Sequence, residues 1–202
     1  MCAVPSRFVL ASASPARLTT LRRAGFDPEV IVSGVDEAGV GETDPGALAL
    51  VLARAKAQAV AAREPDALVL GCDSVLDLDG EALGKPLDAD DASRRWRRMR
   101  GGSGVLRTGH HLVDTTNGRW AEATASTVVH FADLSDDEIA AYVATGEPLA
   151  VAGAFTVDGL GGPFVTGIAG DHHNVVGLSL PLLRDLLAEL GVPVTSLWRA
   201  GV

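Results

Sequence analysis

Runs of apolar residues alternate with polar stretches along this 202-residue chain, and their length and period predict strands and helices in turn. Two pairs, Asp79-Gly80 and Asn117-Gly118, interrupt segments of alternating apolar residues and are strong signals for hairpin turns. The predicted strands lie at residues 8–11, 29–32, 67–71, 75–83, 105–113 and 120–131, with two short strands around Ala154 and Phe164.

Helix starts are marked by side chains that accept hydrogen bonds from the first free backbone N–H groups. Ser14 precedes Pro15 at a favourable first helical position, and Ser135 with Glu138 has the spacing of a capping box. The predicted helices span residues 15–24, 45–63, 88–99, 135–146 and 180–190. Because crossovers and hairpins are mixed, we expect an α/β fold with a mixed twisted sheet and flanking helices, in one domain over residues 1–202.

Composition excludes several classes of protein. The formal net charge is -9 and the one basic run, at residues 94–98, lies in a helical pattern, so no nucleic-acid partner is expected. Cys2 and Cys72 are too few for a disulfide framework or a zinc site. No apolar stretch approaches the roughly 20 residues of a membrane span. We therefore expect a cytoplasmic chain with no membrane partner.

The turn after the first predicted strand has the features of an anion-binding site. Ser12 and Ser14 place hydroxyls and free backbone N–H groups at a helix N-terminus, where the helix dipole favours negative charge. Arg17, in the first turn, adds a guanidinium that can bind phosphate through two parallel hydrogen bonds. The alternative is that Ser14 and Pro15 form an ordinary helix cap without a ligand.

Acidic residues follow two of the predicted strands. Asp73 comes just after the buried run at residues 67–71, and Asp36-Glu37 follows the strand before it. Carboxylates from neighbouring strand ends can hold Mg²⁺ or Mn²⁺, which prefer oxygen ligands and substrate phosphates. The alternatives are a turn cap at Asp73 and a solvated loop charge at Asp36-Glu37.

The two lysines of the chain are candidates for phosphate binding. Lys85 lies between Gly84 and Pro86, which restrict its backbone, so Lys85→Ala is expected to damage turnover more than Lys56→Ala. The five histidines match no metal-binding spacing, and solvent or core positions are expected for them.

Several ordered motifs together resemble the Maf family, the septum-formation-associated nucleoside triphosphate pyrophosphatases. The opening Leu-Ala-Ser-Ala-Ser-Pro-Ala-Arg at residues 10–17 resembles the Leu-Ala-Ser-x-Ser-Pro-Arg-Arg signature of that family. The remaining matching segments are Gly-Cys-Asp-Ser-Val at 71–75, Leu-Gly-Lys-Pro at 83–86, Tyr-Val-Ala-Thr-Gly-Glu-Pro at 142–148, Ala-Gly-Ala-Phe at 152–155 and Asn-Val-Val-Gly-Leu at 174–178.

The resemblance implies a Maf/ITPase-like fold of two lobes around a central nucleotide-binding cleft, often as a homodimer. It implies metal-dependent attack of water on the α-phosphorus of a nucleoside triphosphate, standard or modified, which makes the chain a hydrolase of acid anhydrides. By position, Asp73 matches the general base or metal ligand and Glu37 a second metal ligand. The triphosphate-binding positions match Ser12, Arg17, Lys56 and Lys85.

Departures from the family pattern concentrate where the base is recognised. The specificity positions match Ala16, Ser74 and Asp158; Ala16 replaces an arginine, and Asp158 replaces the glutamine of thymidine- and uridine-type members. Thr19 replaces a glutamate, and Gly102–Gly104 replaces an Arg and His motif.

The alternative function is a nucleotide-binding regulator of cell division with weak or vestigial catalysis. A nucleotidyltransferase is disfavoured because no second substrate motif is present.

Overall fold

The computed structural model describes residues 7–37 and 39–199. Its strands are β1 Arg7–Leu10, β2 Glu29–Val30, β3 Ala67–Leu78, β4 Glu81–Leu83, β5 Ser103–Asp114, β6 Arg119–Phe131 and β7 Val165–Ala169. Its α-helices are α1 Pro15–Arg23, α2 Pro45–Ala61, α3 Ala89–Met99, α4 Asp136–Ala144, α5 His172–Val176 and α6 Leu180–Glu189. Short 3-10 turns lie at η1 Glu147–Ala150, η2 Ala152–Ala154, η3 Gly162–Phe164 and η4 Val194–Leu197. None of these helices is long and apolar enough to cross a membrane.

One mixed sheet joins all the strands in the order β2-β1-β3-β5-β6-β7, with β4 paired to β3 beside this path. β1 runs parallel to both β2 and β3, whereas the other pairs are antiparallel. Parallel neighbours need a crossover, and the connection from β1 to β3 passes through α2. The α/β fold with a mixed sheet is confirmed.

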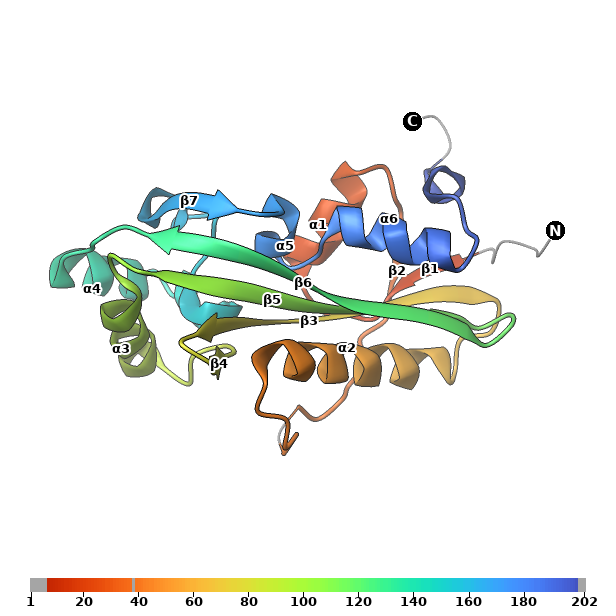
Figure 1. Cartoon of the computed structure of the whole chain (residues 1–202), viewed down its shortest axis with the longest axis horizontal. Helices are drawn as coiled ribbons and strands as arrows, with labels where there is room; N and C mark the ends of the chain where they lie inside the picture. The colour runs from red at the N-terminus through yellow and green to blue at the C-terminus, as the bar shows by residue number, and fades with distance from the viewer. Residues whose placement is uncertain (1–6, 38, 200–202) are drawn as a thin grey trace.

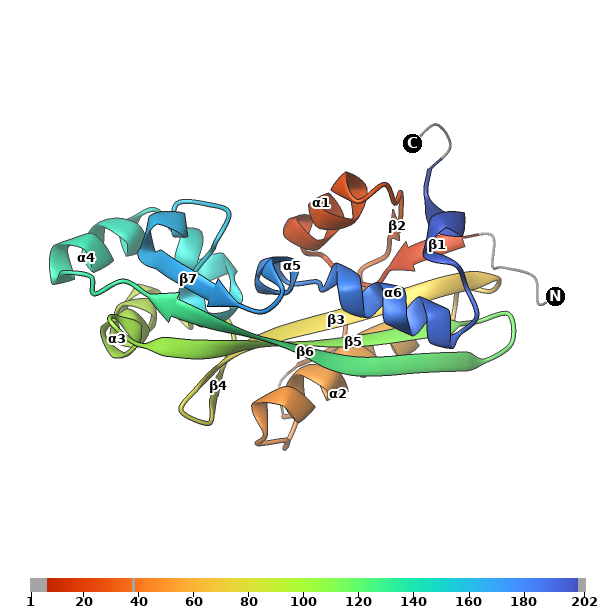
Figure 2. The ribbon, with the colours of Figure 1, turned by 45° about the horizontal axis from the view of Figure 1, so that its top comes forward.

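The long strands β3, β5 and β6 run through two large hydrophobic cores, and a third, smaller core lies between α2 and strands β1 and β3. Helix α2 covers one face of the sheet, while α1, α5 and α6 lie on the other (Figures 1 and 2). One core packs Leu183 and Leu187 of α6 against Leu70 of β3. The second gathers around the buried Trp96 of α3 at the opposite end of the long strands. The two large cores form the two lobes of the molecule.

Strand β3 corrects the expectation that a buried strand ends just before Asp73. The strand continues without a break from Ala67 to Leu78, so Asp73 lies within it. Its continuation is possible because Asp73 and Asp77 are both ion-paired, to Lys56 and Arg107 respectively. Neutralised carboxylates can remain in a sheet where isolated buried charges would be costly.

The strand expected around Ala154 was wrong. Gly153 and Ala154 have φ of 70° and 60°, in the left-handed region that a strand cannot use. The indole N–H of Trp96 donates to the carbonyl oxygen of Ala154 at 2.8 Å and holds this turn. The strand expected around Phe164 exists, but it begins at Val165, directly after η3.

Local signals were the most reliable part of the sequence analysis. The Ser14 hydroxyl accepts from the Arg17 N–H, and the Ser135–Glu138 capping box forms as predicted. Asp79 and Gly80 have φ of 54° and 86°, which is the geometry of the predicted hairpin turn. The five-residue helix α5 was not predicted, since a single turn gives no periodic pattern.

Candidate active site

An ion-paired cluster of three side chains joins α2, β3 and the loop after β2. Lys56 Nζ lies 2.5 Å from Asp73 Oδ1 and 2.7 Å from Glu37 Oε1. The side chains of Lys56 and Asp73 are 11% and 10% exposed, while Glu37 is 54% exposed. The structure therefore brings both predicted metal ligands and one predicted phosphate ligand together. One side of this cluster is open to solvent.

The buried position of Asp73 changes its acidity. Burial penalises the ionised carboxylate and raises the pKa of Asp73, while the charges of Lys56 and Arg17 and the hydrogen bond from Lys56 partly oppose this effect. The net pKa is raised. A carboxylate with a raised pKa is a better proton acceptor than an ordinary surface aspartate.

Two glycines bring α2 onto the sheet and so place Lys56 over Asp73. A Cβ at Gly71 would lie 2.7 Å from the backbone nitrogen of Ala57. A Cβ at Gly109, the cross-strand partner of Asp73, would lie 2.5 Å from the backbone nitrogen of Leu50. Only a residue without a side chain allows this close approach.

Gly109→Ala is expected to destabilise the fold by about 1–3 kcal/mol, because the added methyl overlaps the backbone of α2. The resulting shift of α2 should also lower turnover by displacing Lys56. Calorimetric Tm and nucleotide turnover measure the two effects. Gly41→Ala is the control, since a methyl there meets no atom within 4 Å. A Gly109→Ala protein with unchanged Tm would contradict the close packing described here.

Arg17 is a buried structural clamp as well as a cation beside the site. Its Nε–H donates to the carbonyl oxygen of Gly177, and Nη1 donates to Ser12 Oγ and to the carbonyl oxygen of Cys72. Nη2 donates to Ser74 Oγ at 3.0 Å. Because a guanidinium has five N–H donors, about one remains for a ligand. The two-bond phosphate contact expected from the sequence is therefore not available in this arrangement.

On the side of β3 away from β5, no strand of the described residues pairs with Asp73 or Ser74. Pairing with β1 ends at Leu70, and pairing with β4 begins at Leu76, on the same side of β3. Neighbouring residues of a strand point to opposite faces, so Asp73 faces α2 and Ser74 faces α1 and α5. The carboxylate cluster and the Arg17 clamp thus border the same gap in the sheet from its two faces.

Two of the three predicted specificity positions line one cavity. Ala16 and Asp158 border a space of about 210 Å³, together with Arg23, His172 and His173. Ser74, the third position, does not line it but is bonded to Arg17, the residue after Ala16. The histidines were missed as cavity residues because α5, which carries them, was not predicted.

The remaining candidate, Lys85, follows β4, the strand that pairs with β3 from Leu76 onward. Its side chain is exposed, and no hydrogen bond or ion pair joins it to another described residue. The carbonyl oxygen of Gly84 accepts from Arg95 and from the backbone of Gly153, which anchors the preceding turn. Lys56 is buried and ion-paired whereas Lys85 is exposed, and the larger effect expected for Lys85→Ala stays a prediction.

His110 of β5 has a structural role and does not belong to the Asp73 cluster. It is fully buried, and its Nε2 accepts from the backbone N–H of Ser179 at the start of α6. Burial lowers the pKa of His110 to about 4, so the ring stays neutral at physiological pH. The core position expected from the sequence is confirmed for this residue.

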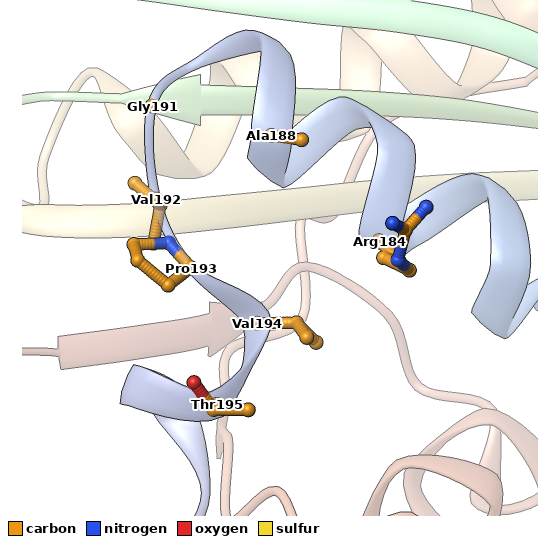
Figure 3. Close-up of a pocket in the computed structure, with 7 residues that line it drawn as sticks. All are labelled: Arg184, Ala188, Gly191, Val192, Pro193, Val194 and Thr195. Carbon is orange, nitrogen blue, oxygen red and sulfur yellow. The ribbon is translucent and has the colours of Figure 1, made fainter.

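A larger depression lies elsewhere, between the end of α6 and η4. Its volume is about 400 Å³, and its walls are apolar apart from Thr195 and Arg184, which contacts Asp185 (Figure 3). None of the predicted site residues lines it. The groups capable of phosphate chemistry lie at the gap in the sheet instead.

Comparison with known proteins identifies the family. A family model described as Maf-like protein matches residues 7–190. The nucleoside triphosphate pyrophosphatase of Salinispora tropica is 64% identical over 203 residues, covering 98% of this chain and 90% of that protein. The protein of the same name from Streptomyces coelicolor is 64% identical over 194 residues, covering 95% and 94%.

A more distant relative and a solved structure complete the comparison. The nucleoside triphosphate pyrophosphatase of Trichormus variabilis is 52% identical over 194 residues, covering 96% of this chain and 98% of that protein. The crystal structure of a nucleoside-triphosphatase / dITP/XTP pyrophosphatase from Mycobacterium abscessus covers 92% of this chain and 95% of that chain, with 15% identity and a TM-score of 0.42. The family match over residues 7–190, with relatives at this level of identity, shows that the chain belongs to the Maf family.

Proposed function

We propose that this protein hydrolyses nucleoside triphosphates to the monophosphate and pyrophosphate in a reaction that requires a divalent metal ion. The observation that carries this proposal is the Asp73–Lys56–Glu37 cluster, in which a buried carboxylate is paired with a cation. Arg17 of α1 is bonded to the residues on either side of Asp73. The proposal is also supported by relatives at 50–64% identity, which carry the name nucleoside triphosphate pyrophosphatase. The cytoplasmic location and the homodimer expected from the sequence stay predictions.

The chemistry of the donor set fits a divalent metal. Among the described residues there is no cluster of three His, Cys, Asp or Glu side chains, but Glu37 and Asp73 offer two carboxylates on either side of Lys56. Mg²⁺ is commonly held by one or two carboxylates, with waters and substrate phosphates completing its shell. Bound there, Mg²⁺ or Mn²⁺ would neutralise charge on the phosphates and on the leaving pyrophosphate.

The chain's own residues supply the remaining functions. Asp73 accepts the proton of the attacking water. Lys56 places a positive charge where the phosphate oxygens become more negative, which stabilises the transition state. The hydroxyls of Ser12 and Ser14 and the free N–H groups at the start of α1 bind the phosphate chain, while Arg17 keeps that turn joined to β3.

A nucleotide panel tests this function. Incubation with the common ribo- and deoxyribonucleoside triphosphates and Mg²⁺ or Mn²⁺ should yield pyrophosphate and monophosphate in equal amounts. The rival function, a regulator with vestigial catalysis, rests on Ala16 and Thr19, which line the cavity and do not belong to the Asp73 cluster. Tight nucleotide binding without pyrophosphate release would favour that regulator.

The base preference follows from the charge at Asp158. An ionised aspartate only accepts hydrogen bonds, so it suits the N1–H and amino group of guanine or the amino group of cytosine. The competing role, a cap on the turn at Gly159, has no support in the contacts, since Asp158 is exposed and bonds to no other described residue.

Asp158→Gln is expected to shift preference toward UTP and dTTP, because an amide can both donate to and accept from a uracil or thymine edge. The measurement is kcat/KM for UTP, dTTP, CTP and GTP with both proteins. A wild type that strongly prefers UTP or dTTP, with no change in the variant, would show that Asp158 does not meet the base.

A further inference from the structure

The carboxylate of Glu147, at the start of η1, is surrounded by hydrogen-bond donors from one short loop. Its Oε1 accepts from Thr156 Oγ1 at 2.6 Å and from the backbone N–H of Gly161 at 3.0 Å. Its Oε2 accepts from the backbone N–H of Leu160 at 2.9 Å. The hydroxyl of Tyr142 donates to Oε1 and accepts from the backbone N–H of Thr156. Both ends of the loop are thus tied to one side chain.

The loop closes so tightly that its glycines have no room for side chains. A Cβ at Gly159 would lie 2.5 Å from Glu147 Oε2, and a Cβ at Gly161 would lie 2.7 Å from the carbonyl oxygen of Thr156. Burial tends to raise the pKa of Glu147, but the hydrogen bonds from the loop and from Tyr142 outweigh it, and the net pKa is lowered. The carboxylate is therefore ionised at neutral pH and binds its donors as a charged acceptor.

Asp158 occupies the middle of this loop, between the tied residues Thr156 and Leu160. It reaches the cavity that Ala16 borders from α1. We infer that Glu147 is a positioning residue for base selection, which holds residues 156–161 so that Asp158 faces the nucleobase. This inference rests on the proposed function. It adds a residue that touches neither the base nor the phosphates.

Glu147→Gln tests the inference, because the amide nitrogen cannot accept the bonds that one carboxylate oxygen accepts. We expect kcat/KM for the preferred nucleotide to fall about tenfold, as for the loss of one charged hydrogen bond. The fall should lie mainly in KM, and the ratio of kcat/KM between preferred and disfavoured bases should move toward one. Glu138→Gln is the matched control, since its carboxylate also accepts from a backbone N–H and a hydroxyl, but at the cap of α4.

Two further variants separate positioning from stability. Tyr142→Phe removes the hydroxyl but keeps the ring that packs against Trp96, so it should change base selectivity in the same direction with the fold intact. In an Asp158→Ala background, Glu147→Gln should change selectivity no further, because the group that it positions is gone. Near-ultraviolet circular dichroism monitors folding of each protein.

Failure of the inference and failure of the proposed function give different results. If the wild type releases pyrophosphate but Glu147→Gln and Tyr142→Phe slow all nucleotides equally, the positioning role is overturned and the function stands. If the wild type releases none, the function is overturned, and the same variants are compared by Kd for the four nucleotides. Unchanged base selectivity in that binding assay overturns the positioning role as well.

Discussion

Asp73→Asn is expected to lower kcat by about 10²–10⁴-fold, the range for loss of a general base. The amide is nearly the same size and keeps its place in β3, but it cannot accept the proton of water or bind a metal as a charge. Burial raises the pKa of Asp73, so its ionised form is unfavourable in the fold. In the variant Lys56 keeps its ion pair with Glu37, so the neutral amide should not lower Tm by more than a few degrees.

The control for this variant is Asp114→Asn. Asp114 is also a buried carboxylate in the sheet, at the far end of β5, where it accepts from Thr116 and Asn117. Asp114→Asn should lower Tm without lowering the kcat of the folded protein. An Asp73→Asn enzyme that retains more than half of wild-type kcat would mean that the catalytic base lies elsewhere.

Lys56→Met should lower kcat/KM by about 10–100-fold, which corresponds to one charge-assisted phosphate contact. A second effect follows from the ion pair, because the positive charge of Lys56 opposes the rise in the pKa of Asp73 that burial causes. Without the ammonium, the pKa of Asp73 should rise further. Since Asp73 must be ionised to act as a base, the acid limb of the pH–rate profile should move to higher pH.

Arg54→Met is the matched control for this second effect. Arg54 lies on the same helix and pairs with Glu122 of the sheet, away from Asp73. Its loss should leave the acid limb where it is. If the acid limb of Lys56→Met does not shift, the charge of Lys56 does not control the ionisation of Asp73.

The parts of this fold that could be predicted from sequence depend on local contacts. Helix caps and the Asp79-Gly80 turn involve neighbouring residues, and both formed as expected. The continuous course of β3 through Asp73 depends instead on Lys56, from a different element. A single sequence does not show that pairing, so the polar residue was interpreted as the end of a strand.

The candidate site residues also divide into those that could be predicted from the sequence and those that depend on contacts between distant segments. The types of residue needed for phosphate chemistry were evident from the sequence, and the structure gathers Glu37, Lys56 and Asp73 as predicted. The roles of Arg17 and Glu147 were not evident, because each depends on several partners far along the chain or in an irregular loop. Such multiple contacts have no periodic sequence pattern.

Hydrolysis of a preferred nucleoside triphosphate in ¹⁸O-enriched water, with mass analysis of both products, tests the central claim most directly. Attack of water on the α-phosphorus at the Asp73 cluster predicts one labelled oxygen in the monophosphate and none in the pyrophosphate. The Asp73→Asn protein should form almost no labelled product in the same time. Label in pyrophosphate, or release of labelled inorganic phosphate with a nucleoside diphosphate, would contradict the proposed reaction.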